Sequence, residues 1–219
     1  MQRITAEIDN LVGLIEGASE FFASGIRQFR GMYPGIHFGL VVEGAQAVID
    51  RVLRGELEIG ITINPADNPA TRIERTMIYQ IGAIVLPDRP LAAKGEGSLA
   101  DCADYPLLIP AENLSLRRIL ENAWLRRMGY SLRGIAEVNN TRLMKALALN
   151  GVGVGWITAF DASIEITSGS LVFLPLVDDK VELSALSIVT ASGRAMSAPA
   201  APFTTHMSHM MERQNAPTI

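Results

Sequence analysis

Residues able to carry out covalent chemistry are few and far apart in this sequence. The single cysteine, Cys102, is flanked by Asp101 and Asp104, whose negative charges disfavour the reactive thiolate. The Gly-x-Ser-x-Gly pattern that marks the nucleophile of α/β hydrolases does not occur. His206 and His209 lie three residues apart on a predicted helix, and two histidines alone make a poor zinc site. We therefore predict that the chain is not an enzyme and holds no metal or other cofactor.

The glycines of segment 151–155 suggest at first a loop that binds a dinucleotide phosphate. Such a loop follows a strand and opens a helix, so that the helix amide groups face the phosphate. Here the order is reversed, because the glycines follow a predicted helix and enter a predicted strand. We interpret Gly151 as a left-handed helix end, and Gly153 and Gly155 as places where strand and helix pack closely.

The overall composition limits the class of protein. The chain has 219 residues, of which 48% are hydrophobic, enough to form the core of one large domain or two small ones. Its net charge of −4 argues against nucleic-acid binding by charge alone. No segment reaches the roughly 20 apolar residues of a membrane span, and the N-terminal segment lacks the apolar run of a secretory signal.

Short apolar runs alternate with helical patterns along the chain, which indicates an α/β fold with parallel strands. The predicted strands cover residues 11–15, 36–42, 58–63, 76–87, 107–110, 135–138, 152–158, 171–174 and 183–190. The predicted helices begin near residue 19 and cover residues 45–54, 116–128, 140–150 and 202–213, after the tail of a short helix in residues 1–10. Residues 64–75 read as a loop. The arginines at 117, 118, 126 and 127 read as a solvated helix face, the alternative being that Arg117 or Arg118 in the first helical turn reaches an anion.

Four of the predicted helices begin directly after a strand end. The starts are Ser19, the turn Gly44–Gln46, residues 113–115, and the pair Asn140 and Thr141. In a parallel fold these four N-termini face the same edge, and we expect the hydroxyl of Ser19 to cap the first of them. Unpaired amide groups and the positive ends of helix dipoles favour an anion such as a carboxylate.

Five segments resemble, in order and spacing, the effector-binding domain of LysR-type transcriptional regulators. They are IRQFRGMYPG (residues 26–35), VLRGELEIGI (52–61), LPDRPLA (86–92), LMKALALNGVGVGWIT (143–158) and GRAMSAPAAPF (193–203). Three positions depart from the family pattern. Glu58 stands where aspartate is usual, Arg89 where histidine is common, and Thr158 where the family has a proline.

The resemblance implies an α/β fold of two Rossmann-like lobes with a ligand cleft between them, similar to type 2 periplasmic binding proteins. Lobe I would comprise residues 10–82 and 183–213, and lobe II residues 83–182. Residues 1–9 would be a stub of the family's linker helix, and residues 214–219 a tail. The winged helix-turn-helix that precedes this domain in the family has no counterpart in this sequence, so DNA would be contacted only through that N-terminal domain.

The function implied by the resemblance is sensing of a small, anionic metabolite in the cleft, which modulates DNA binding by the helix-turn-helix. Carried over position by position, the effector-binding residues are Ser19, Gly44, Ala45, Gln46, Asn64, Ala111, Ser115, Asn140 and Thr141. Alanine at position 45 has no hydroxyl to donate, so Gln46 is expected to hold the ligand instead.

The resemblance also implies partners and a location. We expect a homodimer or tetramer that associates side by side through the first lobe, in the cytoplasm and without membrane contact. The alternative function is a solute-binding protein of a transporter, which has the same lobes and cleft. That function requires export, and the sequence shows no signal peptide for it.

Overall fold

The computed structural model describes residues 11–112, 114–178, 181 and 183–215 of the chain. The chain forms two compact units: unit 1 combines Met1–Ile78 with Ala185–Ile219, and unit 2 is the intervening Tyr79–Ser184. Each unit is built on its own five-stranded sheet. Within the described residues, no helix has the length and apolar content needed to cross a membrane.

Unit 1 follows the β-α-β-α-β order that the sequence predicts. Its elements are β1 (Leu11–Leu14), the 3-10 turn η1 (Glu16–Ala18), α1 (Ser19–Met32), β2 (Leu40–Val42), α2 (Ala45–Arg54), β3 (Leu57–Ile63), β4 (Thr71–Tyr79), β10 (Ser184–Ala191) and α7 (Ala200–Asn215). The strand order is β2-β1-β3-β10-β4. Strand β1 pairs in parallel with both β2 and β3, whereas β10 returns antiparallel to β3. The predicted parallel sheet of the first half is therefore confirmed.

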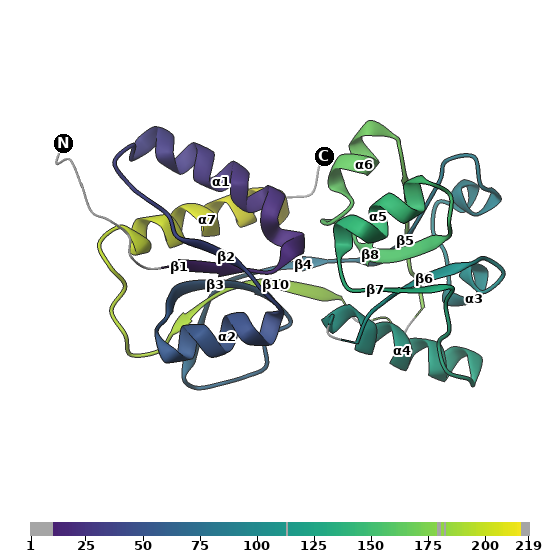
Figure 1. The fold of residues 1–219 in the computed structure, drawn as a ribbon, viewed down its shortest axis with the longest axis horizontal. Helices are drawn as coiled ribbons and strands as arrows, with labels where there is room; N and C mark the ends of the chain where they lie inside the picture. Colours follow the sequence, from purple (N-terminus) through teal and green to yellow (C-terminus); the bar gives the residue numbers. More distant parts are fainter. Residues whose placement is uncertain (1–10, 113, 179–180, 182, 216–219) are drawn as a thin grey trace. The chain divides into compact units, whose positions relative to one another are not determined.

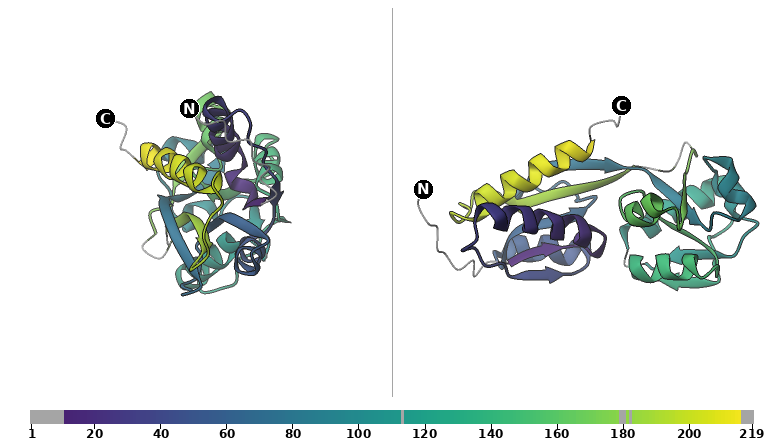
Figure 2. Two further views of the ribbon diagram at one scale, coloured as in Figure 1. Left: turned by 90° about the vertical axis from the view of Figure 1, so that its left-hand side faces the viewer. Right: turned by 90° about the horizontal axis from the view of Figure 1, so that it is seen from above.

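Helices cover both faces of the sheet in unit 1. Helices α1 and α7 lie on one face and α2 on the other (Figure 1). Phe203 of α7 makes edge-on ring contacts with Phe22 and Phe29 of α1, at centroid distances of 5.5 and 5.0 Å. Gly25 allows this close approach, because a Cβ atom there would lie 2.3 Å from the sulfur of Met207. Figure 2 shows the two helices running alongside each other.

Unit 2 repeats the alternation of strands and helices. Its elements are β5 (Ile81–Val85), the 3-10 helix η2 (Pro90–Lys94), α3 (Leu99–Cys102), β6 (Leu107–Pro110), α4 (Ser115–Met128), β7 (Ala136–Val138), α5 (Thr141–Leu149), β8 (Val154–Thr158), α6 (Ser163–Ser168) and β9 (Val172–Pro175). The strand order is β7-β6-β8-β5-β9. Strand β6 is parallel to β7 and β8, and β5 is antiparallel to β8 and β9.

Two apolar clusters fill unit 2, one on each face of its sheet. Helices α3 and α4 contribute to the larger cluster, in which Trp124 and Trp156 are almost fully buried with ring centroids 5.7 Å apart. Helix α5 contributes Met144 and Ala148 to the smaller cluster. Gly155 lies under α5, and a Cβ atom there would approach Met144 to 3.0 Å, which confirms the close packing predicted at this glycine.

Several predicted boundaries were wrong. Strand β2 covers three residues rather than 36–42, and residues 71–75, predicted as a loop, begin the long strand β4. The short helices η2, α3 and α6 were not predicted. The helix tail predicted in residues 1–10 lies outside the described residues.

Candidate functional site

The start of α1 differs from the prediction in one respect. The helix begins at Ser19, as expected, but its N-cap is Ala18, and no side chain caps the first turn. The predicted capping role of the Ser19 hydroxyl was wrong, because the preceding 3-10 turn places an alanine at the capping position. The first amide groups of α1 therefore receive no bond from a capping side chain.

The start of α2 is also left without a side-chain cap. Gly44 is its N-cap in an extended conformation, and the Gly44 carbonyl accepts from the amide of Val48 at 3.1 Å. The carbonyl oxygen of Ala45 accepts a 3.3 Å bond from the Thr62 hydroxyl. Gln46 is exposed, and its side-chain amide donates to Asp50 of the same helix at 2.8 Å. The side chain expected to hold the ligand here is thus bonded along its own helix.

Asn64 has a structural role at the end of β3. It adopts a left-handed conformation with φ of 47°, which asparagine tolerates better than most residues. The backbone amide of Asn64 donates to the carbonyl of Ala185 at 2.8 Å, and its side-chain Oδ1 accepts from the backbone amide of Ala185 at 2.7 Å. This closed pair of bonds joins the end of β3 to the beginning of β10.

In unit 2 the start of α4 follows β6 closely. The amide of Ala111 donates to the carbonyl of Val138 at 2.9 Å, and the Ala111 carbonyl accepts from Leu114 at 3.0 Å. Leu114 is the N-cap and provides no side-chain bond, although its carbonyl accepts from the Arg117 amide at 3.0 Å, and Ser115 opens the helix. Residue 113, which belonged to the predicted start, lies outside the described residues.

The start of α5 lies where it was predicted, and the side chain of Asn140 caps it. Oδ1 of Asn140 accepts from the amide of Leu143 at 2.8 Å, and Thr141 is the first helical residue. Gly151 follows the helix with φ of 70°, which confirms the predicted left-handed end. The packing predicted between strand and helix at Gly153 was wrong in its partner, since a Cβ atom there would lie 2.5 Å from the carbonyl oxygen of Pro106, which directly precedes the neighbouring strand β6.

Topology places these helix starts in two pairs. In unit 1, α1 and α2 follow the parallel strands β1 and β2, so both begin at the carboxyl edge of the same sheet. In unit 2, α4 and α5 follow the parallel strands β6 and β7 and likewise share an edge. Such an edge is where open α/β sheets bind ligands. Each unit therefore presents one such edge, which is a candidate for ligand binding.

Arg117 was wrongly predicted to be solvated. Its side chain is only 9% exposed. Nη1 donates to the carbonyl of Pro110 at 3.1 Å and contacts the Glu137 carboxylate at 3.4 Å, while Nε donates to Glu121 at 3.2 Å. The buried charge is thus compensated by two carboxylates and a strand-end carbonyl.

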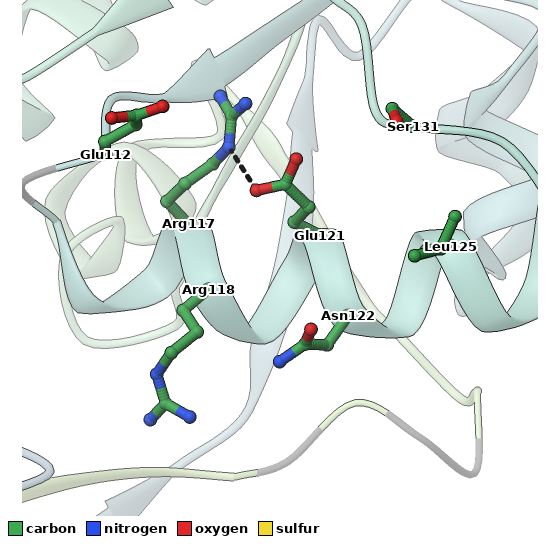
Figure 3. A pocket seen from close by; sticks show the side chains of 7 residues that line it. All are labelled: Glu112, Arg117, Arg118, Glu121, Asn122, Leu125 and Ser131. Atoms are coloured by element: carbon green, nitrogen blue, oxygen red, sulfur yellow. Dashed lines mark hydrogen bonds and ion pairs between the residues drawn. The ribbon is translucent and has the colours of Figure 1, made fainter.

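A cavity of about 350 Å³ lies along α4 beside this arginine (Figure 3). Its lining consists of Glu112, Arg117, Arg118, Glu121, Asn122, Leu125 and Ser131. The close-up shows the Arg117 and Arg118 side chains leaving α4 in different directions, with Glu121 bonded to the former. The cavity lies on the flank of the helix whose start forms part of the unit 2 edge.

Other basic side chains near the strand ends are also paired. Arg51 of α2 contacts Glu43 at 2.6 Å and Glu56 at 2.9 Å. Lys145 of α5 lies between 3.0 and 3.1 Å from the two carboxylate oxygens of Glu165 in α6. The positive charges of these two side chains are thus balanced within the protein.

Aromatic and acidic side chains lie at the same edge of the sheet in unit 2. Tyr79 stacks on Phe160 with ring centroids 4.8 Å apart. The Thr158 hydroxyl donates to Asp161 at 2.8 Å and accepts from the Asp161 amide at 3.2 Å. Burial and the nearby Asp161 charge hold the pKa of the Tyr79 phenol well above its usual value. The threonine that replaces the family's proline therefore closes the turn after β8.

Of the residues first considered for chemistry, Cys102 lies in the packed core, His206 is half-buried and His209 is exposed. Cys102 is 1% exposed, and burial raises the pKa of its thiol to about 11. His206 packs against Phe29 with ring centroids 5.6 Å apart. Within the described parts of the chain, no group of three histidine, cysteine, aspartate or glutamate residues is close enough to hold a metal ion.

Sequence reasoning missed Arg117, Lys145 and the Tyr79–Phe160 stack as parts of these edges. A weak signal existed for Lys145, since it lies among apolar residues on the inward stripe of α5, between Met144 and Ala148. Arg117 gave no comparable signal, because it stands in a run of charged residues that a solvated helix face also contains.

Comparison with known proteins supports the resemblance. The family model described as the LysR substrate binding domain matches residues 12–212. The regulator BbuR of Bordetella bronchiseptica, named as an HTH-type transcriptional regulator, is 22% identical over 158 residues, which cover 72% of this chain and 48% of BbuR. The chain thus spans about half the length of this relative. All four curated relatives are named as transcriptional regulators and not as enzymes.

Solved structures share the fold. The regulatory domain of CcmR from Synechocystis PCC6803, in complex with 2-PG, aligns with a TM-score of 0.80 at 18% identity, covering 93% of this chain and 97% of that domain. The effector binding domain of QuiR, in complex with shikimate, aligns with a TM-score of 0.76 at 14% identity, covering 95% and 98%. The fold is therefore the α/β, type 2 periplasmic-binding-protein-like fold of LysR effector domains, as predicted. On the match to residues 12–212, the chain belongs to the LysR substrate binding domain family.

Proposed function

We propose that the chain is the effector-sensing regulatory domain of a LysR-type transcription regulator. It binds a small, anionic metabolite at the strand-end edges of its two units. The contact residues are Ser19, Gly44, Ala45, Gln46, Asn64, Ala111, Ser115, Asn140 and Thr141. The main support is the family match over residues 12–212. The ligands named for CcmR and QuiR, 2-PG and shikimate, are small molecules bound by domains of this fold.

The chemistry of the helix starts favours an anion. Helices α1, α2 and α4 begin without a side-chain cap, so their first amide groups are available to a ligand. Helix dipoles add positive potential at the same positions. Because Arg51, Arg117 and Lys145 already contact carboxylates, we expect the ligand to carry a small charge, such as a single carboxylate.

Regulation follows from differential binding. A ligand shifts a conformational equilibrium only by its difference in affinity for the two states, so a tenfold preference moves the equilibrium by about 1.4 kcal/mol. In the whole regulator this shift modulates DNA binding through the helix-turn-helix for which the relatives are named. The regulator acts as a homodimer or tetramer in the cytoplasm.

A thermal-shift screen of small carboxylic acids tests the proposal. A true effector at about 100 times its dissociation constant adds roughly 2.7 kcal/mol to the unfolding free energy. The variants Ser19→Ala and Thr141→Val should weaken binding of the hit. Thr205→Val is the matched control, because the Thr205 hydroxyl bonds only to Ala201 of its own helix and is exposed. Unchanged affinity in both site variants would contradict the assigned contacts.

A further inference from the structure

The contacts of Arg117 cross from α4 to two strands. One guanidinium nitrogen, Nη1, reaches both the last residue of β6, Pro110, and the middle residue of β7, Glu137. A guanidinium presents its donors in a rigid fork, and a lysine ammonium does not. The bond to Glu121 stays within α4, four residues along the helix. Two of the three contacts therefore tie the helix to the sheet.

The two strands held by Arg117 lead into the two helix starts of unit 2. Ile109 and Glu137 are paired across β6 and β7, as are Pro110 and Val138. Just beyond this pair, the Ala111 amide donates to the Val138 carbonyl at 2.9 Å. The chain then enters α4 on one side and, through Asn140, α5 on the other.

The pairing itself is short. Strand β7 has three residues and is the edge strand of its sheet, so only one neighbour supports it. Few backbone hydrogen bonds then fix the relative position of the two helix starts. A buried side chain that spans both strand ends adds a constraint at the point where the backbone pairing stops.

From these contacts we propose that Arg117 is a positioning residue of the effector site. It clamps the carboxyl end of β6 to β7, so that the segments that lead into α4 at Ala111 and into α5 at Asn140 are held together. The assignment of those starts to an effector rests on the proposed function. The clamp itself is independent of any ligand and is tested without one, so its failure is distinguishable from failure of the proposed function.

Amide hydrogen exchange of the full chain, resolved by residue, tests the clamp. Arg117→Met should speed exchange of the Ala111 amide, and of the Leu143 amide that bonds to Asn140, at least tenfold relative to amides in the centre of β8. Glu137→Gln should act in the same direction to a smaller extent, and it keeps the test available if Arg117→Met does not fold.

Two variants serve as matched controls. Ile84→Val removes a methyl group from a fully buried position in the other apolar cluster, so it lowers the stability of unit 2 without touching Arg117. In this variant the exchange rates of the amides should rise evenly throughout unit 2. Glu121→Gln removes a carboxylate partner of Arg117 that lies on α4 itself, and Ala111 should stay protected. The proposal is overturned if Arg117→Met gives the even profile of Ile84→Val, or if Glu121→Gln exposes Ala111 as much as Glu137→Gln does.

Discussion

Glu58 shows how a departure from the family pattern is accommodated by local contacts. Its two carboxylate oxygens accept from the amide and the hydroxyl of Ser197, each at 2.8 Å. The half-buried side chain thus joins β3 to the segment that leads into α7, across 139 residues of sequence. The longer glutamate reaches a partner that the sequence alone could not identify, because the contact depends on how distant segments meet.

Loss of this carboxylate should destabilise unit 1. Hydrogen bonds to charged groups contribute about 1.5–3 kcal/mol, so we expect Glu58→Ala to lower the unfolding free energy by that amount in urea titrations. Glu56→Ala is the control, since Glu56 is exposed and pairs with Arg51 and Arg54 at the surface, where such pairs contribute little to stability. Equal losses in the two variants would contradict the structural role of Glu58.

His206 gives unit 1 a dependence on pH. Burial lowers the pKa of its imidazole, and the positive charges of Arg213 and His209 lower it further, although the Gly25 carbonyl opposes them. Its Nε2 is buried and has no hydrogen-bond partner among the residues that the structure describes. Because the folded-state pKa lies below the unfolded value of about 6.5, the stabilising effect is present above pH 6.5 and is lost as pH falls through the folded-state pKa.

The corresponding measurement follows the urea midpoint between pH 7 and pH 5. In the wild type the unfolding free energy should decline over this interval, and His206→Gln should make the decline shallower. His209→Asn should change it much less, because His209 is exposed on the same helix and its charge is the smallest of the influences on His206. Parallel curves for the wild type and His206→Gln would show that this imidazole does not contribute.

At the scale of elements, hydrophobic periodicity predicted the framework well and the boundaries poorly. Strand β6 was predicted with its exact bounds, because four apolar residues between turn signals leave little freedom. The start of strand β4 was predicted at residue 76 instead of Thr71, because the first residues of the strand mix charged and apolar side chains on an exposed edge. The short helices α3 and α6 hold four and six residues, too few for a helical period to be visible.

Some features of the candidate site could likewise be predicted from local sequence, and others could not. Helix starts at Gly44, Asn140 and Thr141 follow from local capping and turn chemistry, which the sequence contains. The buried positions of Arg117 and Lys145 depend instead on carboxylates that lie 20 residues away in sequence. Such pairings arise only when the sheet is assembled, so no local pattern encodes them.

Helices α5 and α6 are tied by the buried pair of Lys145 and Glu165, whose side chains are 11% and 14% exposed. Removing one partner leaves an uncompensated buried charge, so Lys145→Met alone should cost about 3 kcal/mol in the unfolding free energy. The double variant Lys145→Met, Glu165→Leu should recover most of that loss. A double-mutant cycle by urea denaturation measures the coupling, and additive losses would contradict it.

The whole molecule offers two open sheet edges in unit 1 for association. Strand β2 is one edge and β4 is the other. Leu40 and Val42 of β2 are 45% and 55% exposed, and Ile73 of β4 is 48% exposed. Exposed apolar side chains on an edge strand favour pairing with another chain. We propose that the expected side-by-side homodimer through the first lobe uses the β2 edge.

Two lysine variants, one on each edge strand, distinguish the β2 edge from the β4 edge as the dimer contact. Val42→Lys places a charge on the proposed dimer contact, where burying it without a partner is costly, so sedimentation velocity should show a shift from dimer to monomer. Ile73→Lys makes the same change on the opposite edge of the same sheet and should leave the dimer intact. The two variants carry equal charge and comparable exposure, so a difference between them reports the edge used rather than the charge added. If only Ile73→Lys dissociates the dimer, the interface is formed by β4 and not by β2. Coupling between ligand sites of the two copies would then pass through β4.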